Sequence, residues 1–136
     1  MVDLPRRNPV LAVPPAPSDQ ALTHFERTFA FETDCWDVHA ALATGDPGFV
    51  LLDVRSPEAF AAGHLPGAAN LPHARVSERA LADHSGGAVF VVYCAGPHCN
   101  GADRAAVRLA RLGRPVKKML GGVQGWKDEG FRLATV

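Results

Sequence analysis

A run of β-branched and aromatic residues at positions 89–93 leads directly into a cysteine and a loop of small residues. Such a run predicts a strand buried on both faces, as in a parallel sheet. Cys94 ends this strand, and the loop after it consists of Ala95, Gly96, Pro97, His98, Cys99, Asn100 and Gly101. Apolar residues then recur at helical spacing, and Gly113 follows where a left-handed C-terminal cap is typical. Cys94 is therefore expected at the end of a buried strand, beneath the start of a helix.

This position can stabilise a thiolate. A free thiol has a pKa of about 8.5, and the N-terminus of a helix can lower it to roughly 3.5–7.5. The helix end itself supplies only about 0.3–1 kcal/mol. Backbone N–H groups of the loop must therefore supply the remaining stabilisation of the thiolate. Gly96 and Gly101 would allow the loop to curl inward around an anion. The alternative is that Cys94 is a small apolar residue that packs at the end of its strand.

Composition excludes several classes of protein. The chain has 136 residues, enough for one domain with its own core, and 47% of them are hydrophobic. It has no apolar run of membrane-spanning length, and its 14 Lys and Arg residues balance 14 Asp and Glu residues. We therefore expect no nucleic-acid and no membrane partner. The chain start lacks the apolar core of a secretory signal, and three cysteines are too few for a disulfide framework. A cytoplasmic location is therefore expected.

The N-terminal residues are expected to lie outside the main domain. Residues 1–17 contain five prolines and predict an extended leader without helix or strand pairing. Residues 18–32 predict a helical extension, in which Ser18 caps a helix at about residues 19–29. Leu22, Phe25 and Phe29 share one side of that helix. The helix could cover the outside of the domain or serve as a partner-binding arm, and both interpretations stay open.

From residue 33 onward, predicted helices and strands alternate. Asp34 can cap a helix that ends near residues 44–48, and Cys35 is expected to pack inward from it. Strands are expected at 49–54, 68–71, 89–93 and 115–120, and a final helix at 123–129. Short helices are expected after the caps Ser56 and Ser77, through Ala62 and Ala82. This alternation predicts an α/β sandwich with a parallel sheet, whose functional site lies at the carboxyl ends of the strands.

Three separated stretches resemble the rhodanese (sulfurtransferase) domain. They are residues 52–60 (LDVRSPEAF) with 63–68 (GHLPGA), residues 91–94 (VVYC), and residues 120–122 (LGG) with Trp126. Their order and spacing match that family, and the resemblance covers residues 33–131. It implies a rhodanese-like sandwich over residues 33–136, with a parallel five-stranded sheet flanked by helices.

The resemblance also implies a chemistry. In rhodaneses the cysteine that matches Cys94 accepts a sulfane sulfur as a persulfide, which loop amides hold, and passes it to a thiol or to cyanide. Cys94 is then the catalytic residue and the loop from Ala95 to Gly101 binds substrate, while Asp53 and Arg55 support the site by tying their strand end to neighbouring loops. The implied partners are a small sulfur donor or a persulfide-carrying protein, and a thiol acceptor. No cofactor is implied, and no metal is expected because the loop offers at most three ligands with strained spacing.

The loop departs from the family pattern in length and in charge. It is longer than usual, and the arginine that stands near the end of the usual loop is absent. Phosphatases of the same fold place an arginine where this chain has Asn100, so a phosphatase would lack its phosphate clamp. His98 is the only potential cation in the loop, so we expect weak binding of thiosulfate.

Two hypotheses of different classes follow. The first is a sulfurtransferase that works through a Cys94 persulfide. The second is a non-catalytic rhodanese-like module for protein interaction or redox sensing that uses Cys94 and Cys99. These cysteines are five positions apart in sequence, and a curled loop could bring their Cα atoms within the roughly 4.4–6.8 Å that a disulfide requires.

Overall fold

The computed structural model describes residues 8–136, which divide into two compact units at Phe31. In the first unit, a turn is closed by a hydrogen bond from the Leu11 N–H to the Asn8 carbonyl (3.1 Å), and residues 8–17 contain no helix or strand. Residues 1–7 of the predicted leader lie outside the described residues. Helix α2 (Ser18–Phe31) confirms the helix predicted from residue 19 and extends past residue 29. Its apolar side chains Leu22, Phe25 and Phe29 are 61%, 63% and 73% exposed.

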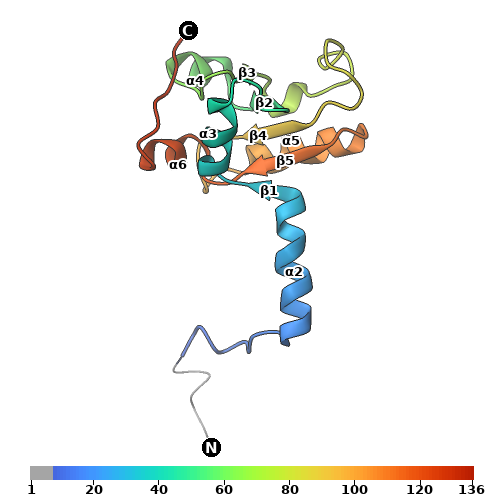
Figure 1. The fold of residues 1–136 in the computed structure, drawn as a ribbon, viewed down its shortest axis with the longest axis vertical. Coiled ribbons are helices and arrows are strands. Elements are labelled where there is room, and N and C mark those ends of the chain that lie inside the picture. The colour runs from blue at the N-terminus through green and yellow to red at the C-terminus, as the bar shows by residue number, and fades with distance from the viewer. Residues whose placement is uncertain (1–7) are drawn as a thin grey trace, which may run out of the picture. The chain divides into compact units, whose positions relative to one another are not determined.

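The second unit, Phe31–Val136, is built on a parallel sheet of five strands in the order β1-β5-β4-β2-β3 (Figure 1). The strands are β1 (Glu32–Thr33), β2 (Val50–Asp53), β3 (Ala69–Asn70), β4 (Phe90–Tyr93) and β5 (Val116–Met119). This confirms the predicted α/β class and its five parallel strands. The central strand β4 pairs with β2 on one side and with β5 on the other. Strand β1, which the sequence did not indicate, is a short edge strand paired with β5.

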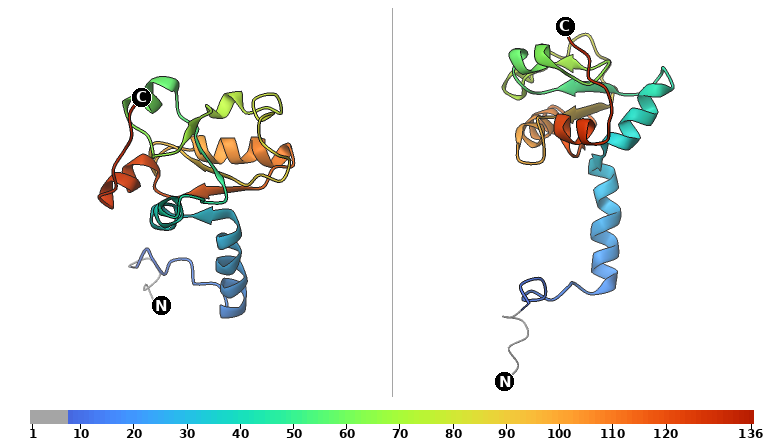
Figure 2. Two further views of the ribbon diagram at one scale, coloured as in Figure 1. Left: turned by 45° about the horizontal axis from the view of Figure 1, so that its top comes forward. Right: turned by 90° about the vertical axis from the view of Figure 1, so that its left-hand side faces the viewer.

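Side chains of β4 alternate between two apolar layers, as the pleat of a strand requires. Phe90 and Val92, followed by Cys94, belong to the layer that includes residues of α5 (Gly101–Arg111). Val91 and Tyr93 belong to the opposite layer, with residues of α3 (Cys35–Ala43) and α6 (Gly122–Asp128). Figure 2 shows α5 and α3 on opposite sides of the sheet. The cysteine thus enters the layer beneath α5.

Local signals place most helix ends where the sequence predicts them. The Asp34 carboxylate accepts the N–H of Asp37 (2.8 Å) at the start of α3. The Ser56 hydroxyl accepts the N–H of Ala59 (3.2 Å) at the start of α4 (Pro57–Ala62). Helix α5 ends just before Gly113, whose φ of 76° is left-handed, as a C-terminal cap requires. These caps confirm the predicted boundaries and leave the loop of residues 94–100 between β4 and α5.

The helix predicted after Ser77 is wrong. The Ser77 hydroxyl does accept the N–H of Ala80 (3.1 Å), but residues 78–83 form turns rather than a helix. The segment is too short to offset the cost of helix nucleation and runs into two glycines at 86–87. A 3₁₀ helix, η1 (His73–Arg75), lies upstream instead and packs against α5. Within residues 8–136, no helix is long and apolar enough to cross a membrane.

Candidate active site

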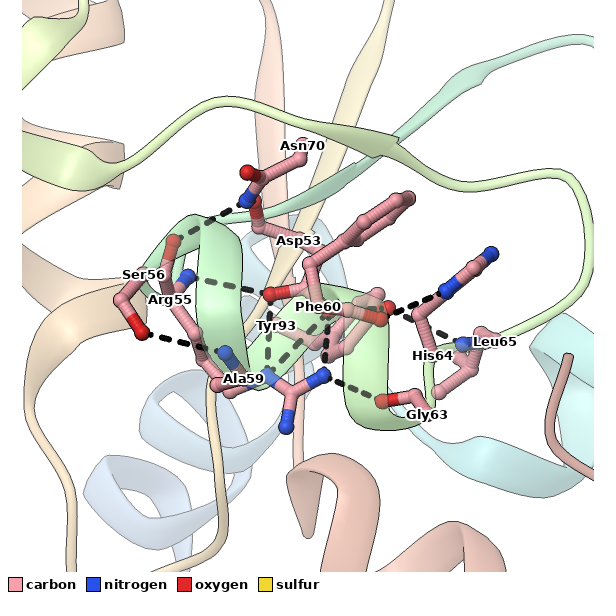
Figure 3. Close-up of polar contacts among 10 residues, drawn as sticks. All are labelled: Asp53, Arg55, Ser56, Ala59, Phe60, Gly63, His64, Leu65, Asn70 and Tyr93. Carbon is pink, nitrogen blue, oxygen red and sulfur yellow. Dashed lines mark hydrogen bonds and ion pairs between the residues drawn. The ribbon is translucent and has the colours of Figure 1, made fainter. Parts of the chain in front are cut away.

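A buried polar network fixes the end of β2 beside β4 (Figure 3). Asp53 is fully buried, and its Oδ2 accepts hydrogen bonds from the Tyr93 hydroxyl (2.7 Å) and from Nη2 of Arg55 (2.7 Å). The Tyr93 oxygen in turn accepts the N–H of Leu65 (3.1 Å). Burial opposes the charge of Arg55, but the hydrogen bonds and charge of Asp53 outweigh this and raise its pKa. The buried carboxylate is therefore paired and hydrogen-bonded, as burial of a charge requires.

The same network anchors the loops around the strand end. Nη2 of Arg55 also donates to the carbonyl of Gly63 (2.6 Å), in the turn after α4. The side-chain amide of Asn70 donates to the carbonyls of Asp53 (3.1 Å) and Arg55 (3.0 Å). Arg55 and Asp53 thus tie β2, β4 and the turn after α4 together, and Arg55 also lines a cavity that reaches Cys94.

Cys94 follows β4 directly, and only 7% of its surface is exposed. Against the larger effect of burial, the backbone N–H groups of Ala95 and Gly101 lower the pKa of its thiol. A Cβ at Gly101 would lie 2.7 Å from this sulfur, so any larger residue would displace the thiol. Helix α6 supports the loop from below, because the Cys94 carbonyl accepts the N–H of Val123 (3.1 Å). A Cβ at Gly122 would lie 2.5 Å from that carbonyl oxygen, so this approach requires glycine.

Cys99 lies beside Cys94 in the same loop. Its N–H donates to the Gly96 carbonyl (3.1 Å), which closes a turn, and the Gly101 N–H donates to its Sγ (3.5 Å). The Cys94 thiol donates a hydrogen bond to Cys99, and this bond lowers the pKa of Cys99. Burial, and then the same bond, raises the pKa of Cys94 to about 11. The pair therefore loses its first proton from Cys99, which is the more exposed thiol.

This order of ionisation is opposite to the expectation from the sequence, which placed the stabilised thiolate on Cys94. The reason is that burial beneath α5 costs a charged sulfur more than the N–H groups of Ala95 and Gly101 return. Those N–H groups nevertheless favour a negative charge on the Cys94 sulfur. Their dipoles remain available to a negative charge that develops there during a reaction.

Two cavities open beside the thiol pair, and both Cys94 and Cys99 line each of them. The smaller, of about 170 Å³, lies on the β5 side and is lined by Gly96, Pro97, Asp103, Lys118 and Gly121. The larger, of about 490 Å³, lies on the β2 side and is lined by Arg55, Ala59, His73, Ala74, Asn100 and Gly101. Cys94 can therefore be reached from both sides of β4.

The predicted substrate-binding loop is divided between these cavities. Ala95, Asn100 and Gly101 line the larger one, Gly96 and Pro97 line the smaller one, and Cys99 lines both. His98 lines neither cavity. It is exposed, and its ring lies against Gly96 instead.

The sequence analysis missed polar side chains outside the loop, among them His73 and Lys118. His73 of η1 lines the larger cavity, and Lys118 of β5 lines the smaller one. The Lys118 ammonium contacts the carboxylates of Asp103 (2.9 Å) and Glu32 (3.5 Å), so its charge is already matched. Neither residue carries a local signal, because the strand order alone brings them to the cysteine.

Fold and site together define a parallel α/β domain with a cradled cysteine at the carboxyl end of its central strand. Residues 37–129 match the Rhodanese-like domain family, and the chain belongs to that family. The resemblance carried by the three sequence stretches is thereby confirmed.

The chain is similar in sequence or structure to several known proteins. It is 44% identical over 82 residues to the HTH-type transcriptional regulator Rv0324 of Mycobacterium tuberculosis, a match that covers 60% of this chain and 35% of the regulator. The BH2092 protein from Bacillus halodurans is 33% identical with a TM-score of 0.84, and the match covers 88% of this chain and 87% of that one. The rhodanese-like domain of Alr3790 from Anabaena is 27% identical with a TM-score of 0.68, covering 77% and 79% of the two chains. The chain thus spans only 35% of the regulator's length.

Proposed function

We propose that the protein is a sulfurtransferase that carries sulfane sulfur as a persulfide on Cys94. The observation that supports this best is the position of Cys94, a buried sulfur at the end of β4 that lies close against Gly101 and whose negative charge the backbone N–H groups of Ala95 and Gly101 favour. A negative charge on a persulfide in this position would meet fixed dipoles instead of bulk water. Membership of the rhodanese-like family adds support, because the family includes sulfurtransferases.

The reaction would have two halves. In the first, the Cys94 thiolate attacks the sulfane sulfur of a donor, and the donor's S–S bond breaks to release a thiolate, or sulfite when the donor is thiosulfate. In the second, an acceptor thiolate attacks the outer sulfur, and Cys94 leaves with the electron pair of the broken bond. Cys94 must first lose its proton, and the neighbouring Cys99, whose pKa is lowered, would serve as the base that accepts it. A reducing cytoplasm, where both thiols stay reduced, belongs to this proposal.

A redox-sensing module is the second candidate, and the position of both thiols at the same two cavities favours it. Peroxide would convert Cys94 to a sulfenic acid, and Cys99 would then attack that sulfur to form a disulfide and release water. The similarity to a protein described as a transcriptional regulator is consistent with such a role.

Sulfur transfer separates the two candidates. Wild type, Cys94→Ser, Cys99→Ser and Cys35→Ser are supplied with thiosulfate or glutathione persulfide, and transfer to cyanide or to a thiol is followed. We expect Cys94→Ser to lose all transfer, and Cys35→Ser, which alters a buried thiol outside both cavities, to retain it. Wild type that transfers no sulfur but forms a Cys94–Cys99 disulfide with peroxide would reject the first candidate in favour of the second.

A further inference from the structure

A cluster of aromatic side chains lies at the surface of α3 and the segment that follows α6, two helices that lie side by side (Figure 1). Trp36 of α3 is 62% exposed, although tryptophan is highly buried on average. The centroid of its ring lies 5.6 Å from that of Phe131. The exposed His39 stacks on the same Phe131, with centroids 3.8 Å apart and ring planes 8° apart. We call Trp36, His39 and Phe131 the ring cluster.

The ring cluster is held in place by Trp126 of α6. Trp126 is only 1% exposed, and the centroid of its ring lies 5.0 Å from that of Phe131. Its indole N–H donates to the carbonyl of Arg132 (2.8 Å), and its own carbonyl accepts the N–H of Phe131 (3.2 Å). Phe131 is therefore fixed before any partner arrives, and a preorganised surface loses less entropy on binding.

The charge around the ring cluster is predominantly negative. The two segments that carry it, residues 34–39 and 126–132, contain more carboxylates than cations, with Asp34, Asp37, Asp128 and Glu129 against Lys127 and Arg132. Cys35 directly precedes Trp36 and experiences the resulting field. Burial is the main reason that the pKa of Cys35 is raised to about 11, and the charges of three of these carboxylates raise it further. A cation at this surface would therefore be attracted.

Arginine is the side chain that uses both properties of this surface. Its guanidinium is planar, stacks on aromatic faces and forms two parallel hydrogen bonds with a carboxylate. Lysine supplies the charge without the planar stacking group. Nucleic acids and anionic membranes carry the same sign of charge as the surface and would be repelled. Exposed tryptophan is also enriched among the residues that dominate the binding energy of protein interfaces.

We infer that the ring cluster and its neighbouring carboxylates form a docking surface for an arginine-bearing segment of a partner protein. The guanidinium would stack on Trp36, and the carboxylates would supply the opposite charge. Trp126 and Cys35 belong to the apolar layer opposite to that of Cys94. None of the ring cluster lines the two cavities beside Cys94. Docking there would leave both cavities open and does not depend on sulfur transfer.

The test measures binding of a fluorescein-labelled hexaarginine peptide by anisotropy, with hexacitrulline as its uncharged isostere. We expect hexaarginine to bind more tightly than hexacitrulline and to lose affinity as salt is added, because salt screens exposed charges. Trp36→Ala should weaken hexaarginine binding about threefold or more, whereas Val107→Ala, which shortens an exposed side chain of α5, should not. Glu129→Gln should weaken binding about twofold. Glu58→Gln, the same change at an exposed position of α4, should leave it unaltered.

Acrylamide quenching of fluorescence locates the bound peptide. The chain has two tryptophans, and Trp126 is buried, so acrylamide reports mainly on Trp36. Bound hexaarginine should therefore reduce the quenching. Wild type that binds hexaarginine no more tightly than hexacitrulline would overturn the inference, as would equal affinities of wild type and Trp36→Ala. Equal weakening by Glu129→Gln and Glu58→Gln would show attraction to the overall charge and would also overturn it.

Discussion

Tyr93→Phe removes a single oxygen atom from the buried network beside Cys94. That oxygen donates to Asp53 (2.7 Å) and accepts the N–H of Leu65 (3.1 Å), and Tyr93 is 0% exposed. The variant leaves the Leu65 N–H unpaired and deprives a buried carboxylate of one hydrogen bond. A hydrogen bond to a charged group contributes about 1.5–3 kcal/mol, and an unpaired buried donor costs about 1–3 kcal/mol. The free energy of unfolding should therefore fall by about 2–5 kcal/mol.

Urea denaturation at pH 7 measures this loss directly. Thr135→Val is the control, because it removes an exposed hydroxyl that makes no side-chain hydrogen bond to any other residue of 8–136, and it should change stability by no more than about 0.5 kcal/mol. Asp53 keeps its bonds to Arg55 in Tyr93→Phe, so the variant should still fold. A loss no larger than that of the control would refute the account of the network.

Three further predictions address the cysteines and the loop. Burial raises the pKa of Cys35 from 9.0 to about 11, so folding favours the protonated thiol, and this stabilisation fades as the pH rises through that window. Wild type should lose about 1 kcal/mol more stability between pH 8 and pH 10 than Cys35→Ala does, and parallel denaturation curves would count against this. Gly122→Ala should destabilise far more than Gly130→Ala in thermal unfolding, because both glycines have positive φ but only Gly122 has backbone atoms within 3 Å of the added Cβ. Cys99 should react with iodoacetamide more slowly in Cys94→Ala than in Cys94→Ser, because only the serine keeps a hydrogen-bond donor beside the Cys99 sulfur. Equal rates in the two variants would show that a donor at position 94 does not lower the pKa of Cys99.

Much of the fold could be predicted because its signals are local. The buried run at 89–93 and the caps Asp34 and Ser56 act within a few residues of where they stand, and each marks an element of the structure. Strand β1 was missed because two residues carry no periodicity, and Glu32 and Thr33 form a strand only beside β5. The helix expected after Ser77 failed for the opposite reason, since a correct cap preceded a segment too short to propagate.

The site was predictable only in part. Cys94 and its loop are marked by strand, glycines and helix in one continuous stretch. His73 and Lys118 reach the cysteine through the strand order, which no short stretch reveals. The ionisation order of the thiols also depends on tertiary structure, because burial of Cys94 beneath α5 decides it. Local sequence therefore indicates where the reactive cysteine lies. Packing determines which thiol ionises first and which molecules can reach Cys94.

The central claim, that Cys94 carries a persulfide, is tested most directly by locating the transferred sulfur. Wild type and Cys94→Ser are each mixed with one equivalent of glutathione persulfide. The masses of the intact protein and of its proteolytic peptides are measured before and after a thiol acceptor is added. We predict one added sulfur atom on the peptide that contains Cys94, its loss to the acceptor, and no addition to Cys94→Ser. Sulfur found on Cys35 or Cys99 while Cys94 remains an unmodified thiol would contradict the account.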